Sequence, residues 1–255
     1  LLSSEVAIGT TTANGEGEFS ITTSTLADSN YVLTVTATDA AGNISDASDA
    51  LSITIDATAP GKPSIITTTS LTNDATPTIE GIAEAGSTVE LFNGDVSLGT
   101  TTADETTGAY TITPAELSDG DYSLTVTATD AAGNISAASD ALSMTVDATA
   151  PAQPAITTTT TLTSNATPTI EGTAEADSTV TLLSSGVAIG TTTANGDGQF
   201  SITTSTLADS NYVLTVTATD AAGNISAASS ALNITVDTTA PGKPSIITTT
   251  SLTND

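Results

Sequence analysis

The chain has 255 residues with two Lys and no Arg, His or Cys, against 29 Asp and Glu, and its formal charge is −27. So few cations exclude a nucleic-acid-binding protein and a protein that docks on an anionic membrane surface, because phosphates would stay unneutralised. The absence of His and Cys excludes a Ser-His-Asp triad, a thiolate nucleophile and a soft-metal site, whereas oxygen-ligated cations suit this composition.

A unit of about 90 residues recurs along the chain. The string TATDAAGNIS occurs at 36–45, 127–136 and 217–226, and D-[AT]-T-A-P occurs at 56–60, 147–151 and 237–241. The steps between copies are 91 and 90 residues in both cases. They predict four segments, which are a partial repeat without its first strands at 1–59, whole repeats at 60–150 and 151–240, and the first strand of a further, truncated repeat at 241–255.

Alternation of apolar and polar residues predicts the strands of the second repeat, in chain order, at 63–66, 79–83, 89–91, 110–112, 122–129 and 142–146. In the clearest run, Tyr122, Leu124 and Val126 face one side while Ser and Thr face the other. Turn-forming residues separate the runs, for example at 72–74 and 132–134. About seven strands without helical periodicity predict an all-β fold of tandem immunoglobulin-like β-sandwiches joined end to end.

The motif Asp-x-x-Tyr stands at the start of the long strand in every repeat, with its Tyr at positions 31, 122 and 212. This pattern predicts a tyrosine corner, in which the phenol bonds to the backbone where the chain crosses between sheets. An exposed, ligand-stacking Tyr is the alternative, but the ring shares the inward face with Leu and Val. Tyr110 is predicted to lie in the core, and Asp119 and Asp74 are predicted to cap turns.

Alternating strand directions place the loops at 84–87, 103–108 and 130–134 at the end where a repeat begins. The last Asp of one repeat should therefore face the first loops of the next. Carboxylates that converge without Lys or Arg repel one another, and calcium, which takes six to eight oxygen ligands, would remove that repulsion. We therefore predict Ca²⁺ ligands at two junctions, which are Asp56, Glu84, Asp130 and Asn134 at the first, and Asp147, Glu175, Asp220 and Asn224 at the second.

A reading without metal stays open for these residues. The D-A-A-G-N loop also suits a tight hairpin in which Gly133 and Asn134 take left-handed conformations, and Asp147 also suits a solvated strand end. The two roles can coexist. Paired carboxylates can serve glycoside hydrolysis, but identical active sites in series would be unusual, so no enzyme is expected.

Three motifs together carry a family resemblance. A unit with V-D-x-T-A-P at its end, T-P-T-I-x-G-x-A-E near its start and V-T-A-T-D-A-A-G-N-x-S before its last strand resembles the bacterial Ig-like domains of giant RTX-type and biofilm-associated adhesins of Gram-negative bacteria. The resemblance covers the whole chain. It implies type I secretion, retention at the outer-membrane surface, and calcium at domain junctions that stiffens a long extender.

The expected function is therefore that of a structural extender, rigidified by calcium, that holds an adhesive domain away from the cell. The alternative is a module that itself binds a host, glycan or biofilm-matrix ligand. Such recognition usually needs aromatic or Arg anchors, and of the seven aromatic residues only Phe92 is predicted to face outward. The expected partners are neighbouring repeats of the same chain and calcium ions. We expect a monomer without membrane insertion, because no apolar run approaches the ~20 residues of a transmembrane helix.

Overall fold

A computed structural model describes residues 1–247 of the protein. All regular secondary structure in this part of the chain is β-strand, and these residues form no helix long and apolar enough to cross a membrane. This confirms the predicted all-β class. By packing, the chain divides into two compact units, one made of Leu1–Ser70, Thr76–Leu117 and Asp121–Met144 and the other of the remaining described residues.

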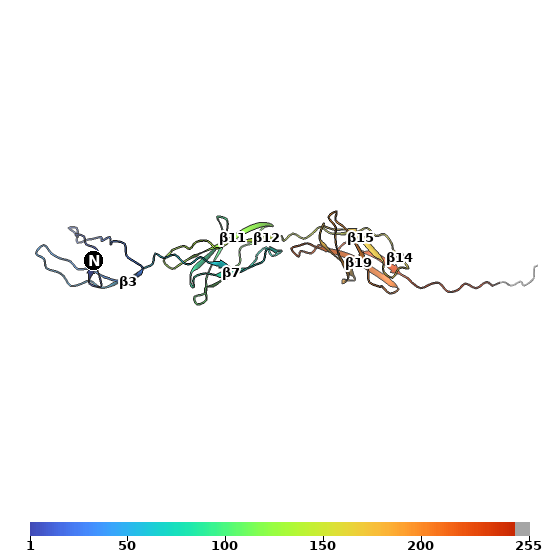
Figure 1. The fold of residues 1–255 in the computed structure, drawn as a ribbon, viewed down its shortest axis with the longest axis horizontal. Helices are drawn as coiled ribbons and strands as arrows, with labels where there is room; N and C mark the ends of the chain where they lie inside the picture. Colours follow the sequence, from blue (N-terminus) through green and yellow to red (C-terminus); the bar gives the residue numbers. More distant parts are fainter. Residues whose placement is uncertain (248–255) are drawn as a thin grey trace, which may run out of the picture. The chain divides into compact units, whose positions relative to one another are not determined.

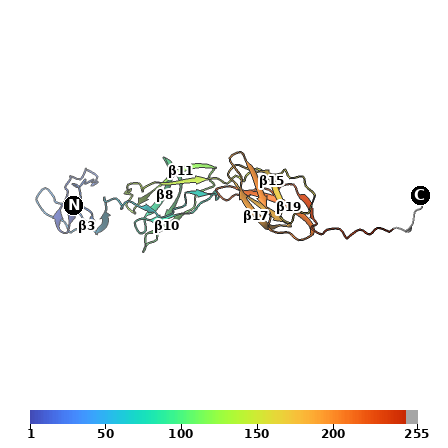
Figure 2. The same cartoon turned by 45° about the vertical axis from the view of Figure 1, so that its right-hand side comes forward.

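The second repeat folds as two antiparallel sheets with one added parallel strand (Figure 1). Its strands are β5 (Ser64–Ile65), β6 (Leu71–Thr72), β7 (Ile79–Ile82), β8 (Thr88–Asn93), β9 (Val96–Thr102), β10 (Ala109–Ile112), β11 (Gly120–Thr129) and β12 (Leu142–Val146). One sheet has the order β10-β7-β5 and the other the order β6-β12-β11-β8-β9. Figure 2 shows β8 beside β11, its antiparallel partner.

The first strand of the second repeat differs from the prediction. Residues 63–66 contain only β5, and Leu71 and Thr72, of which Thr72 was expected to begin a turn, form a separate strand in the opposite sheet. They pair in parallel with Thr145 and Val146 at the free edge of β12. Tertiary pairing therefore overrides the turn signal, and the turn begins one residue later.

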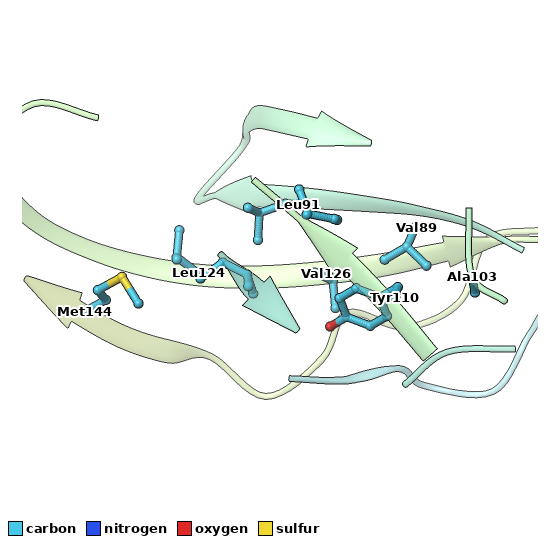
Figure 3. Packing of buried hydrophobic residues seen from close by; sticks show 9 residues of the cluster. Val89, Leu91, Ala103, Tyr110, Leu124, Val126 and Met144 are labelled. Atoms are coloured by element: carbon cyan, nitrogen blue, oxygen red, sulfur yellow. The ribbon is translucent and has the colours of Figure 1, made fainter. Parts of the chain in front are cut away.

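A core cluster lies between the two sheets of the second repeat (Figure 3). Leu91, Leu124 and Val126 come from one sheet and Tyr110 from the other, and the Tyr110 ring lies beside Val126. Tyr110 is 4% exposed, which confirms its predicted core position, and burial raises the pKa of its phenol to about 12. Its hydroxyl donates to the Ser64 carbonyl at 2.9 Å, so the one polar atom of the ring is satisfied inside the core.

The third repeat has the same plan. Its strands are β13 (Ala155–Ile156), β14 (Leu162–Thr163), β15 (Thr169–Thr173), β16 (Thr179–Ser184), β17 (Val187–Thr193), β18 (Gln199–Thr203), β19 (Ser210–Thr219) and β20 (Leu232–Val236). They form sheets of order β13-β15-β18 and β14-β20-β19-β16-β17. Phe200 takes the place of Tyr110 in the core and is 4% exposed.

The first repeat has a single sheet of order β2-β1-β3-β4, built from β1 (Leu2–Ser3), β2 (Val6–Ala7), β3 (Ser29–Thr34) and β4 (Leu51–Ile55). Residues 18–22, which correspond to β18, form no strand, because residues 1–57 include no counterpart of β15 to pair with them. Apolar residues line an open cavity of about 450 Å³ there, among them Phe19 and Ile21. Within the segment predicted at 241–255, residues 241–247 form no strand, and the rest lies outside the described residues.

Two tyrosine corners are confirmed by hydrogen bonds. The hydroxyl of Tyr31 donates to the Ala27 carbonyl and that of Tyr212 to the Ala208 carbonyl, both at 3.0 Å. Each bond joins the start of the long strand to the backbone just before it, as the Asp-x-x-Tyr motif predicted.

Candidate functional site at the repeat linkers

We call residues 56–60, 147–151 and 237–241 the first, second and third linker.

The D-A-A-G-N loop of the second repeat, residues 130–134, is closed by hydrogen bonds to the carboxylate of Asp130. Asp130 Oδ1 accepts from the amides of Ala132 at 2.8 Å and Asn134 at 2.9 Å, while Asp130 Oδ2 accepts from Asn134 Nδ2 at 2.8 Å. Gly133 has φ of 94°, the left-handed conformation that glycine allows at little cost. The hydrogen bond from the Asn134 side chain is the main cause that lowers the pKa of Asp130.

The same loop recurs in the other two repeats. Asp39 accepts from the Asn43 amide at 2.9 Å and from Asn43 Nδ2 at 2.8 Å, and Asp220 accepts from Asn224 at the same two distances. The loop geometry is therefore local, because it forms in the first repeat without a preceding linker inside the chain.

The Asn of this loop also reaches the linker that precedes its repeat. Asn134 Nδ2 donates to the main-chain carbonyl of Asp56 at 3.1 Å, and Asn224 Nδ2 donates to that of Asp147 at 2.6 Å. Each pair is separated by more than 75 residues in the sequence. The loop therefore contacts the linker through an amide nitrogen in both cases.

A second acid holds each linker from the other side. Asp119 accepts from the amide of Ala148 at 2.7 Å and from the hydroxyl of Thr149. These bonds, with that from the Thr149 hydroxyl as the larger cause, lower the pKa of Asp119. Asp119 was predicted to cap a turn, and the structure instead places its carboxylate on the linker.

Equivalent acids hold the other two linkers. Asp28 accepts from the amide of Ala57 at 2.9 Å, and Asp209 accepts from that of Thr238 at 2.8 Å. The constant spacing of 29 residues between acid and amide is the sequence signal that could have found these contacts.

The predicted calcium ligands are only partly brought together. The Asp56 carbonyl, the Asp130 carboxylate and the Asn134 amide meet at the first linker, and their counterparts Asp147, Asp220 and Asn224 meet at the second. The carboxylates of Asp56 and Asp147 instead accept from the amide two residues further along their own linkers. For Glu84 and Glu175 the contacts are made within their own loops, where their main-chain carbonyls accept from the hydroxyls of Ser87 and Ser178. No three acidic side chains of residues 1–247 form a group that could hold a metal.

The groups that meet at the first and second linkers nevertheless have the chemistry to bind a hard cation. A carboxylate, a main-chain carbonyl and an amide are the oxygen ligands that calcium takes. The Asn134 amide nitrogen lies within hydrogen-bond distance of two of these oxygens, at 2.8 Å from Asp130 Oδ2 and 3.1 Å from the Asp56 carbonyl. The amide oxygen would replace the nitrogen there if the side-chain amide turned over.

Comparison with known proteins identifies relatives. The 248 residues that align with exoglucanase B of Cellulomonas fimi are 36% identical to it and cover 92% of this chain but 22% of the relative. Chitinase A1 of Niallia circulans is 36% identical over 124 residues, which cover 46% of this chain and 18% of the relative. The chain thus spans less than a quarter of each relative's length.

The matches to solved structures are more distant. The fibronectin(III)-like modules of Clostridium thermocellum CbhA match at 20% identity and a TM-score of 0.45, covering 68% of this chain and 92% of that one. The BSP domain of a biofilm-associated protein matches at 22% identity and a TM-score of 0.29, covering 71% of this chain and 30% of that one. The model of the bacterial Ig-like domain matches residues 1–57, 64–148 and 152–238, which together make up most of the chain. The chain therefore belongs to the bacterial Ig-like domain family and contains that domain, in part or whole, three times.

Proposed function

We propose that this chain is a structural extender segment of a secreted bacterial surface protein. Successive Ig-like repeats act as spacers, and their linkers limit how far each repeat can turn against the next. The observation that carries the proposal is that the first and second linkers are each hydrogen-bonded to both the repeat before them and the repeat after them. Asp119 binds the second linker from its own repeat, and Asn224 binds it from the repeat that follows.

Linker composition supports the same role. The five residues D-[AT]-T-A-P end in Pro, whose ring fixes φ and restricts the residue before it. Such a segment loses less conformational entropy on ordering than a Gly/Ser linker does. A few hydrogen bonds therefore suffice to order it.

Calcium is part of the proposal. At the first junction Asp130, Asn134 and the Asp56 carbonyl would hold the ion, with Glu84 as a further ligand if its loop turned. Asp220, Asn224, the Asp147 carbonyl and Glu175 would do so at the second. The ion would offset the repulsion between acids in a chain of formal charge −27.

A distal adhesive domain and outer-membrane anchoring are the expected context for this extender. A second context is favoured by the relatives, which are named exoglucanase B and chitinase A1. There the repeats would separate the domains of a secreted polysaccharide-degrading enzyme. In both contexts we propose that these repeats do not catalyse, and that direct ligand binding is secondary because Phe92 is half-buried beside Thr125.

Spin labels across the second linker test the proposal. The chain has no Cys, so Thr111→Cys and Ser201→Cys, both at exposed strand positions, introduce unique label sites in the second and third repeats. We expect a narrow distance distribution that widens in Asp119→Ala and stays narrow in the matched control Asp28→Ala, because Asp28 holds the first linker. A broad distance distribution in the labelled parent chain would contradict the proposed role as an extender.

Calorimetry tests the calcium part separately. We expect two sites in the chain. Asp220→Asn removes the charge of a proposed carboxylate ligand and should weaken the second site while leaving the first unchanged, because a whole sandwich separates them. The third linker, at Asp237, is not followed by another D-A-A-G-N loop within the chain and should bind weakly or not at all. Unchanged stoichiometry and affinity in Asp220→Asn would place the ion elsewhere.

A further inference from the structure

Two of the three asparagines in the D-A-A-G-N loops make a hydrogen bond that is not needed to close the loop. Asn43, Asn134 and Asn224 all donate to the Asp four residues before them at 2.8 Å. Only Asn134 and Asn224 also donate from the same nitrogen to a linker carbonyl, at 3.1 and 2.6 Å. Since an amide NH₂ group has two hydrogens, one serves the loop and the other the linker.

The loop presents this second hydrogen in a fixed direction. The main chain closes it, since Asp130 N donates to the Asn134 carbonyl and Gly133 N donates to that of Asp130. The carboxylate then holds both the main-chain and the side-chain nitrogen of Asn134. An amide that is already ordered loses little entropy when it bonds to the linker.

We propose that Asn134 and Asn224 are metal-independent links that join the first and the second linker to the repeat that follows each of them. The link is neutral on the donor side and needs no cation, so it works in a chain with almost no Lys or Arg. It forms in the absence of calcium, and it deepens the proposed extender role, on which it rests.

The link also sets a condition on any cation. Asn134 Nδ2 lies between Asp130 Oδ2 and the Asp56 carbonyl, so an ion that takes both oxygens has to displace the amide nitrogen. The amide link and a bound cation are alternative ways to hold the same linker.

Nuclear magnetic resonance in the presence of EDTA tests the link directly. We expect the side-chain NH₂ signals of Asn134 and Asn224 to exchange with solvent about fivefold more slowly than that of Asn43, as one additional hydrogen bond implies. A scalar coupling across the hydrogen bond should connect Asn224 Nδ2 to the Asp147 carbonyl carbon. Asn43 is the control, because it makes the same loop bond without a linker contact.

Variants separate the link from loop folding. Asn224→Asp keeps the size of the side chain but removes its NH₂ group, and we expect faster backbone exchange in the second linker with EDTA present. Asn43→Asp changes the equivalent loop of the first repeat and should leave both linkers unchanged. Equal exchange for all three asparagines in the parent chain, or no effect of Asn224→Asp on the second linker, would overturn the proposal. Both measurements exclude calcium, so a failure to bind calcium would count against the calcium part of the proposed function and not against this link.

Discussion

The first and third repeats have nearly the same sequence over residues 1–55 and 182–236, and yet they pack differently. Phe19 is 55% exposed, whereas its counterpart Phe200 is 4% exposed. Phe200 lies on β18, which pairs with β15, and residues 1–57 contain no counterpart of β15. In contrast, the Asp39 and Asp220 loops have the same hydrogen bonds in both repeats. In this chain the D-A-A-G-N loops form locally, while the core depends on strands that pair across long stretches of sequence.

The largest expected difference between the two repeats is in the cost of removing the aromatic side chain. Phe200→Ala should destabilise the third repeat by about 3–5 kcal/mol, because it leaves a cavity in a closed core. Phe19→Ala should change the first repeat by less than about 1 kcal/mol, since that ring is already exposed. Hydrogen exchange of the strand amides measures both. Equal effects would mean that the first repeat closes its core in another way.

A second expected effect concerns Gly172, which lies against the Phe200 ring. A Cβ atom at Gly172 would overlap the Ala155 carbonyl oxygen and the Phe200 ring, so Gly172→Ala should destabilise the third repeat by about 1–3 kcal/mol. At Gly196 a Cβ atom meets nothing within 4 Å, and Gly196→Ala is the control. Thermal unfolding of both variants checks the prediction, and a neutral Gly172→Ala would show that β13 and the Phe200 ring can shift to accept a methyl group.

The linkers should respond to pH alike in all repeats. Hydrogen bonds lower the pKa of Asp28, Asp119 and Asp209 below the ordinary 3.8. A lowered pKa means that the carboxylate stabilises the folded linker above the unfolded pKa, and that this contribution is lost as pH falls through the folded value. Spin-label distances across the linkers should therefore stay constant from pH 7 to about 4 and broaden only in stronger acid. Broadening near pH 6 would contradict the role of these three acids.

The smallest expected effect is a gain in stability. Thr204 is 3% exposed, and its hydroxyl has no hydrogen-bond partner among the described residues. Thr204→Val keeps the shape and removes that polar atom, so the third repeat should gain about 1 kcal/mol. Thr23 is the half-buried counterpart in the first repeat, and Thr23→Val should have no measurable effect. Chemical denaturation of both variants tests this, and a loss of stability in Thr204→Val would indicate a bound water at the hydroxyl.

Short-range patterns in the sequence predicted most of the sandwich. Alternation identified β11, and the Asp-x-x-Tyr motif identified the corners at Tyr31 and Tyr212. The pattern failed for β6, because its parallel pairing with β12 depends on residues more than 70 positions away.

The candidate site was harder to predict for the same reason. Loop polarity indicated that Asp56 and Asn134 lie close together, but it did not reveal which atoms meet, and the contact is made by a main-chain carbonyl that carries no sequence signal. Asp119 was taken as a turn cap because its partners lie in the linker, 29 and 30 residues away. Side-chain types thus predict a location, while the hydrogen-bond partners depend on the folded backbone.

The backbone order of the three linkers, measured by ¹⁵N relaxation in one sample of the chain, tests most directly whether hydrogen bonds hold the linkers. Residues 57–58 and 148–149 are held on two sides, by Asp28 and Asp119 within their repeats and through the Asn links from the repeats that follow. Residues 238–239 are held by Asp209 and by Asp237 of the same linker, and among the described residues no Asn link from a further repeat reaches them. We expect order parameters near 0.85 in the first two linkers and a clearly lower value in the third. Order parameters below about 0.6 in all three would contradict the claim that hydrogen bonds hold the linkers.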